Sequence, residues 1–126
     1  MKIIRLNKLN YEPSSHEDPK SPGALKKVML AKDDLVPGRV QMINWAKIPA
    51  RKSFAGHYHE DMEEIFIILS GKVKITVGKE KEVVERGDLV VVPASMVHIM
   101  ENLTDDDVEY LAIGVSGQKG GKTVIV

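Results

Sequence analysis

The chain has 126 residues, 18 basic and 18 acidic side chains, and no cysteine. This length suits one domain, with a hydrophobic core large enough to be stable without covalent cross-links. The missing cysteines exclude disulfides, thiolate metal sites and cysteine nucleophiles, and they suit a reducing cytoplasm. The balanced charge does not favour a nucleic-acid partner. No apolar run is long enough to span a bilayer, and the N-terminus lacks the apolar region of a signal peptide. We therefore expect a cytoplasmic protein with neither a nucleic-acid nor a membrane partner.

Residues 1–24 are predicted to form a short N-terminal arm, and residues 25–126 the main domain. Three of the six prolines fall within residues 11–23, which predicts an extended arm or loop there. Residues 1–10 are expected to form a short strand or to pack on a neighbouring subunit. His16 lies in the arm, where we predict a solvated residue rather than a ligand.

From residue 26 onward, short stretches rich in valine and isoleucine alternate with turn signals. Strands of this length and spacing predict an all-β sandwich or small barrel without a long helix. Residues 65–69 and 89–92 do not alternate in polarity, so we expect both of their faces to be covered, with a partner subunit as one candidate cover. The predicted strands are 27–30, 39–48, 54–59, 64–69, 72–77, 81–85, 89–92, 97–102, 108–115 and 123–126.

Two histidines one residue apart indicate a metal site. Side chains alternate along a strand, so His57 and His59 face the same side. Glu64 opens the next predicted strand after a tight turn, and His98 lies on a later strand that a barrel can bring alongside. Three imidazoles and one carboxylate are a usual donor set for a divalent transition metal, and Mn, Fe, Ni, Cu and Zn all accept it. We predict these four residues as ligands of one ion that keeps positions open for water or substrate.

The same alternation predicts the wall of a small-molecule cavity. Residues two and four positions beyond Glu64 share its face, and residues two positions either side of His98 share that histidine's face. Met42 shares a strand face with Asn44, and for Tyr110 a hydrogen bond to a ligand and simple packing are both open. The predicted pocket-lining residues are Phe66, Ile68, Met96, Met100, Tyr110 and Met42.

The histidine clusters resemble the two sequence motifs of the cupin superfamily. The first motif is a glycine, His-x-His, three or four residues, Glu, six residues and Gly. His57, His59, Glu64 and Gly71 fit it with four residues between the second histidine and the glutamate. Glu63 satisfies the shorter spacing, but the six residues that precede Gly71 select Glu64.

The second cupin motif is Gly, five residues, Pro-x-Gly, two residues, His, three residues and Asn. It is matched by Gly87, Pro93, His98 and Asn102. The chain departs from the family at two glycine positions, which are Arg51 upstream of the first motif and Ser95 after Pro93. Since glycine usually supplies a positive φ, Ser95 can alter that turn.

The resemblance implies a double-stranded β-helix, a jelly-roll-like cupin barrel of a single domain that is usually a homodimer. It also implies His57, His59, Glu64 and His98 as the metal ligands. We expect a metal-dependent enzyme on a small molecule, of dioxygenase, isomerase or decarboxylase type. The alternative is a non-catalytic module that binds or senses a sugar or small acid. No nucleophile or second acid–base pair is visible, so no catalytic residue is assigned beyond the metal centre.

Overall fold

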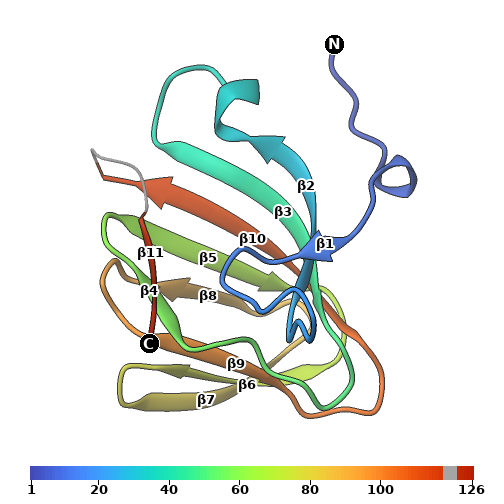
Figure 1. Cartoon of the computed structure of the whole chain (residues 1–126), viewed down its shortest axis with the longest axis vertical. Coiled ribbons are helices and arrows are strands. Elements are labelled where there is room, and N and C mark those ends of the chain that lie inside the picture. Colours follow the sequence, from blue (N-terminus) through green and yellow to red (C-terminus); the bar gives the residue numbers. More distant parts are fainter. Residues whose placement is uncertain (118–121) are drawn as a thin grey trace.

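The computed structural model describes residues 1–117 and 122–126, which form two facing antiparallel sheets (Figure 1). One sheet has the strand order β1-β2-β3-β10-β5-β8, and the other has the order β11-β4-β9-β6-β7. The strands are β1 (Glu12–Pro13), β2 (Leu25–Ala31), β3 (Val40–Ile48), β4 (His57–His59), β5 (Met62–Ile68), β6 (Lys72–Val77), β7 (Glu80–Glu85), β8 (Leu89–Val92), β9 (His98–Asn102), β10 (Val108–Ser116) and β11 (Thr123–Ile125). The described residues contain no α-helix, only the short 3-10 turns η1 (Leu6–Lys8) and η2 (Lys32–Asp34). The architecture is therefore the predicted all-β double-stranded β-helix. No helix within these two ranges is long and apolar enough to cross a membrane.

The predicted strands are present, and the main difference in their bounds concerns β4. The predicted strand 54–59 begins only at His57. Phe54 lies outside β4, and a hydrogen bond fixes its backbone to β9: its N–H donates to the carbonyl of Met100 at 3.2 Å. Phe54 and His57 are both buried although they stand three positions apart, so the alternation is broken between them. Residues 1–10 contain η1 and no strand, and the Leu6 carbonyl accepts a hydrogen bond from Lys27 Nζ at 3.2 Å.

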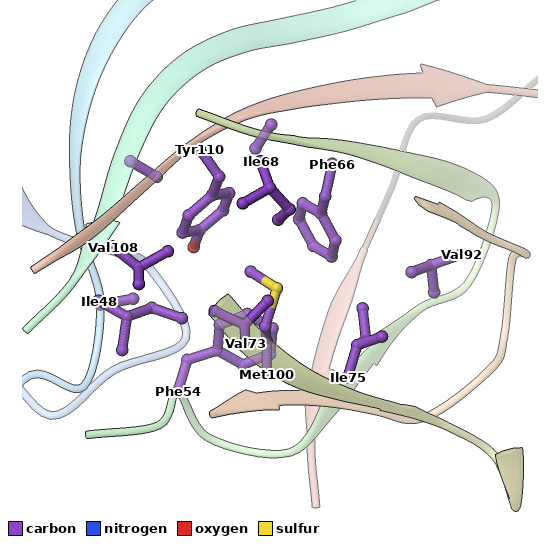
Figure 2. Close-up of a cluster of buried hydrophobic side chains, with 13 residues drawn as sticks. Ile48, Phe54, Phe66, Ile68, Val73, Ile75, Val92, Met100, Val108 and Tyr110 are labelled. Carbon is purple, nitrogen blue, oxygen red and sulfur yellow. The ribbon is translucent and has the colours of Figure 1, made fainter. Parts of the chain in front are cut away.

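The apolar core lies between the two sheets (Figure 2). On β10, buried side chains alternate with partly exposed ones along the whole strand, as period-two packing requires. Phe66 and Tyr110 meet edge to face with ring centroids 5.4 Å apart, a favoured aromatic geometry. Phe66 follows Glu64 by two positions on the inward face of β5, so the predicted carboxylate ligand is embedded at the margin of this core.

The outer face of the six-stranded sheet is less covered than the sequence predicts. Leu89 and Val91 on the edge strand β8 are 55% and 49% exposed, and Ile65 and Ile67 on β5 are partly buried. Among the described residues no layer packs outside this edge strand, so a single chain does not cover both faces of 89–92, and cover by a partner subunit stays a prediction. The homodimer stays a prediction.

The two positions where the chain lacks a family glycine keep a glycine-like backbone. Arg51 and Ser95 have φ of 62° and 65°, and they are the two non-glycine residues with positive φ in the described part of the chain. The Ser95 N–H donates to the His59 carbonyl at 2.7 Å, and its hydroxyl donates to the Glu60 carbonyl at 3.2 Å. The turn after Pro93 is thus preserved with serine, and it ties that loop to the end of β4.

Candidate metal centre

Both sheets contribute to the predicted metal site. His57 and His59 lie on β4, His98 lies directly opposite His57 on β9, and Glu64 comes from β5 of the other sheet. One ligand atom from each of these four residues lies within 4.8 Å of all the others. All four side chains are buried, with exposures of 0%, 6%, 1% and 6% in the order just given. The fold therefore brings the four predicted ligands to one point.

Each imidazole is oriented by a hydrogen bond from its outer nitrogen. Nδ1 of His57 lies 2.7 Å from the Ala55 carbonyl, and Nδ1 of His98 lies 3.0 Å from the Met96 carbonyl. A carbonyl only accepts, so Nδ1 donates in both and Nε2 keeps its lone pair. His59 Nδ1 lies 3.0 Å from Thr123 Oγ1 on β11. Such outer partners fix the ring orientation of histidines that bind metals.

The inward-facing donor atoms have no partner of their own. Nε2 of His57, His59 and His98 and Oε2 of Glu64 are buried without a hydrogen bond in the described part of the protein. The nearest approach among them is between two members of the set, since His59 Nε2 lies 2.6 Å from Glu64 Oε2. A buried polar atom without a partner costs about 1–3 kcal/mol. Four such atoms at one point match the donor set of a cation, so these residues fit a transition metal.

Burial also sets the charge state of the centre. It lowers the pKa of His57 to about 3, with a further contribution from the neighbouring His16, and it lowers the pKa of His98. Burial alone would raise the pKa of Glu64, but the contact with His59 and the proximity of the other two imidazoles outweigh it and lower that pKa. Neutral imidazoles beside an ionised carboxylate are the forms that bind metal ions.

Aromatic rings close the side of the centre that faces the core. The Phe54 ring meets the His57 ring at 5.2 Å and the His98 ring at 5.9 Å, both edge to face. The Phe66 ring lies 6.0 Å from that of His98. These contacts exclude water from behind the histidines, which strengthens electrostatic interactions at the centre.

The prediction that His16 is solvated is wrong. Its side chain is 12% exposed, and its ring stacks on that of His57 with centroids 3.9 Å apart. Nδ1 of His16 lies 2.6 Å from Glu17 Oε2, which also accepts the Ala55 N–H at 2.7 Å. Glu17 Oε1 accepts the Gly23 N–H at 2.7 Å. We call residues 14–17 the cover segment, because these bonds hold it over the site.

A cavity of about 50 Å³ adjoins the centre on the side of the cover segment. Of the predicted pocket residues, Met42 and Tyr110 line it together with His59 and Glu64. Burial raises the pKa of Tyr110, so its hydroxyl keeps its proton. The remaining lining residues are not among the six predicted pocket residues. They are Ser14, Ser15, His16, Lys26, Asn44, Ala46 and Ala112.

The other predicted pocket residues lie elsewhere. Phe66, Ile68 and Met100 are at most 1% exposed and belong to the core behind the site (Figure 2). Met96 is 38% exposed and lines a separate surface pocket beside Pro93. It does not share the face of His98, because β9 begins only at His98 and the left-handed backbone of Ser95 breaks the alternation before it.

Comparison with known proteins agrees with this architecture. The family described as Cupin domain matches residues 44–114, which include both histidine clusters and more than half of the chain. An uncharacterized protein of Methanocaldococcus jannaschii is 29% identical over 103 residues, which cover 82% of this chain and 78% of that protein.

Two solved structures show the same fold at low identity. One is described as a predicted oxalate decarboxylase from Thermotoga maritima. It has a TM-score of 0.78 at 22% identity, with 92% of this chain and 100% of that chain covered. The other is a sugar phosphate isomerase from a cupin superfamily, from Silicibacter pomeroyi. It has a TM-score of 0.76 at 15% identity, with 99% and 82% covered. With the family matched over both motifs and the double-stranded β-helix in place, the chain belongs to the cupin superfamily.

Proposed function

We propose that this cupin is a metal-dependent enzyme that acts on a small molecule, with one divalent transition metal held by His57, His59, Glu64 and His98. The observation that carries the proposal is the convergence of four buried donor atoms within 4.8 Å, none of which has a hydrogen-bond partner among the described residues. When bound, such an ion polarises a carbonyl oxygen or lowers the pKa of a water molecule.

The chain's own residues would prepare the site for this chemistry. The carbonyls of Ala55 and Met96 hold two imidazoles in the tautomer that binds metal, and Phe54 excludes water behind them. Two protic side chains, Tyr110 and His16, line the cavity in front. We propose a reaction of dioxygenase, isomerase or decarboxylase type. The names of the two structural neighbours, a predicted decarboxylase and an isomerase, support the last two classes.

Metal binding is tested with a pair of neighbouring acids. Glu64 is 6% exposed and faces the centre, whereas Glu63 is exposed on the opposite face of the same strand. Chelator-treated protein would be titrated with Mn²⁺, Fe²⁺, Ni²⁺, Cu²⁺ and Zn²⁺, with elemental analysis for stoichiometry and a competing chelator for affinity. We expect one ion per chain. Glu64→Gln should weaken binding by more than the roughly 10- to 100-fold that loss of an outer-shell partner causes.

Glu63→Gln serves as the matched control and should change the affinity less than about twofold, because an exposed carboxylate contributes little. A wild-type protein that binds no ion, or equal losses in the two variants, would refute the metal centre.

Catalysis is tested separately from metal binding. Metal-loaded protein would be incubated with sugar phosphates, diketones, phenols and small organic acids, and the products followed by mass spectrometry. Turnover that disappears in His98→Ala supports the enzyme. Tight binding of one of these compounds without any product, whichever metal is loaded, would instead support the non-catalytic binding or sensor module.

A further inference from the structure

We propose that the ligand of this cavity is a small 2-hydroxy carboxylic acid whose carboxylate is bound by Lys26 and whose hydroxyl bonds to Asn44. The proposal rests on the metal-dependent function above and names its substrate class. Both residues line the cavity that also contains His59 and Glu64.

The sheet register directs Lys26 into the cavity. Lys26 on β2 stands opposite Ala46 on β3, and Ala46 in turn stands opposite Tyr110 on β10. Both of these partners face inward, since they are 2% and 3% exposed. The next residue, Lys27, has the opposite direction, because its Nζ lies 4.7 Å from the centre of the Tyr11 ring. Lys26 is thus the one lysine that lines the cavity in the described part of the chain.

The ammonium group of Lys26 is not neutralised by a nearby carboxylate. Glu12 on β1 is directly opposite Lys26 in register, but it is exposed and forms no ion pair with it. Glu64 shares the cavity, yet its carboxylate is in contact with His59 and within 3.9 Å of His98. Among the described residues Lys26 has no ion-pair partner, so its donors remain available to an anionic ligand.

Asn44 supplies a second, independent indication of a ligand. It is 8% exposed, and its Oδ1 is buried without a hydrogen-bond partner in the ranges that the structure describes. It lies two positions from Ala46 along β3 and lines the same cavity. A buried amide oxygen without a partner is unfavourable, and an O–H donor of a ligand would satisfy it.

The size of the cavity limits which kinds of anion can reach the ammonium group of Lys26. A volume of about 50 Å³ holds only a few water molecules. A planar carboxylate with one adjacent hydroxyl matches this space better than a tetrahedral phosphate on a sugar. Lys26 would then bind the carboxylate at one end of a short molecule, and the Asn44 amide would bind the hydroxyl at the other end.

The test measures the binding of glycolate to metal-loaded protein by calorimetry, after elemental analysis of each sample. The variants are Lys26→Met and, as the control, Lys27→Met, which removes the same charge from the adjacent outward position. We expect Lys26→Met to keep one ion per chain and to bind glycolate about 10- to 100-fold more weakly, the usual effect of losing a charge-assisted hydrogen bond. Lys27→Met should change the affinity less than about twofold.

An uncharged probe and a variant of Asn44 complete the design. Glycolamide, which has no charge, should bind wild type and Lys26→Met equally. Asn44→Leu should abolish the preference for glycolate over acetate while the ion is retained. Lys26→Gln, checked by circular dichroism, replaces Lys26→Met if that variant does not fold.

The outcomes distinguish the two proposals. Wild-type protein that binds no metal overturns the proposed function and this inference with it. Metal-loaded wild type that does not bind glycolate, or that binds it as tightly after loss of Lys26, overturns the inference alone. Tighter binding of inorganic phosphate than of glycolate overturns the assignment to a carboxylic acid.

Discussion

Replacing Asn102 should destabilise the fold strongly and leave the metal ligands in place. Asn102 is 1% exposed at the end of β9, and its Nδ2 donates to the carbonyls of Ile48, Pro49 and Asp106 at 2.9, 3.2 and 2.7 Å. Its Oδ1 accepts the N–H and the hydroxyl of Thr104, both at 2.8 Å. One amide therefore ties the end of β3 to the loop before β10.

The size of the effect follows from this network. Asn102→Leu keeps a similar volume and removes about four net hydrogen bonds, each worth about 1 kcal/mol, so the free energy of unfolding should fall by about 4 kcal/mol. With an unfolding entropy of about 2.1 cal/mol/K per residue, a chain of 126 residues should then melt about 15 °C lower. Asn102 stands four strand positions, or about 13 Å, from His98, so the metal stoichiometry should not change.

The assay is thermal and urea unfolding followed by circular dichroism, with elemental analysis on the same samples. Thr104→Val is the companion variant, because it removes the hydroxyl, which lies 2.8 Å from Asn102 Oδ1 and 2.9 Å from the Asp106 carbonyl, and keeps the N–H bond to Asn102. A hydroxyl has one proton to donate, so this variant should lower the free energy of unfolding by about 1 kcal/mol. If Asn102→Leu lowers the free energy of unfolding by no more than Thr104→Val does, the several hydrogen bonds of this amide contribute little to stability and the prediction is wrong.

Two further predictions concern backbone strain and pH. Ser95→Val should lower the free energy of unfolding by about 1–2 kcal/mol more than Ser95→Gly does, because both variants lose the hydroxyl bond to the Glu60 carbonyl but only the branched side chain resists a φ of 65°; urea midpoints of the two variants check this. Without metal, the folded protein binds the His57 proton only near pH 3, while the unfolded chain binds it near 6.5. The unfolded state therefore holds more protons in this window, and stability should fall as the pH is lowered from 6.5 toward 3, by at most about 1.4 kcal/mol per pH unit from this group. Urea titrations of chelator-treated protein at several pH values test this, and a slope that persists unchanged in His57→Gln would contradict it.

Strand alternation and the resemblance to the cupin motifs together predicted which four side chains meet at the candidate metal centre. His57 and His59 share a face because two residues make one strand repeat, and this rule needs no knowledge of distant contacts. The spacing of Glu64 to Gly71 selected the buried acid over its exposed neighbour Glu63. The strand bounds were predicted with similar success, because alternating polarity reports directly which side of a sheet is buried.

The errors arise where the chain leaves regular structure or where contacts are long-range. Met96 was assigned to the face of His98 by counting across a turn in which the strand period does not apply. The role of His16 depends on Glu17, whose bond to the Ala55 N–H joins residues 38 positions apart. One local signal was available, since Gly23 lies where a Cβ would be 1.8 Å from the Ser53 carbonyl oxygen, which marks a close approach of the arm to the barrel.

The cover segment divides the site between two parts of the chain. The four candidate ligands fall inside the matched family region, residues 44–114. Ser14, Ser15, His16 and Lys26, which form much of the opposite cavity wall, fall outside it. Relatives can therefore share the same ion-binding centre and differ in the wall that meets the substrate. Before a reaction is assigned to one cupin from another, their first thirty or so residues should be compared as well as their histidine motifs.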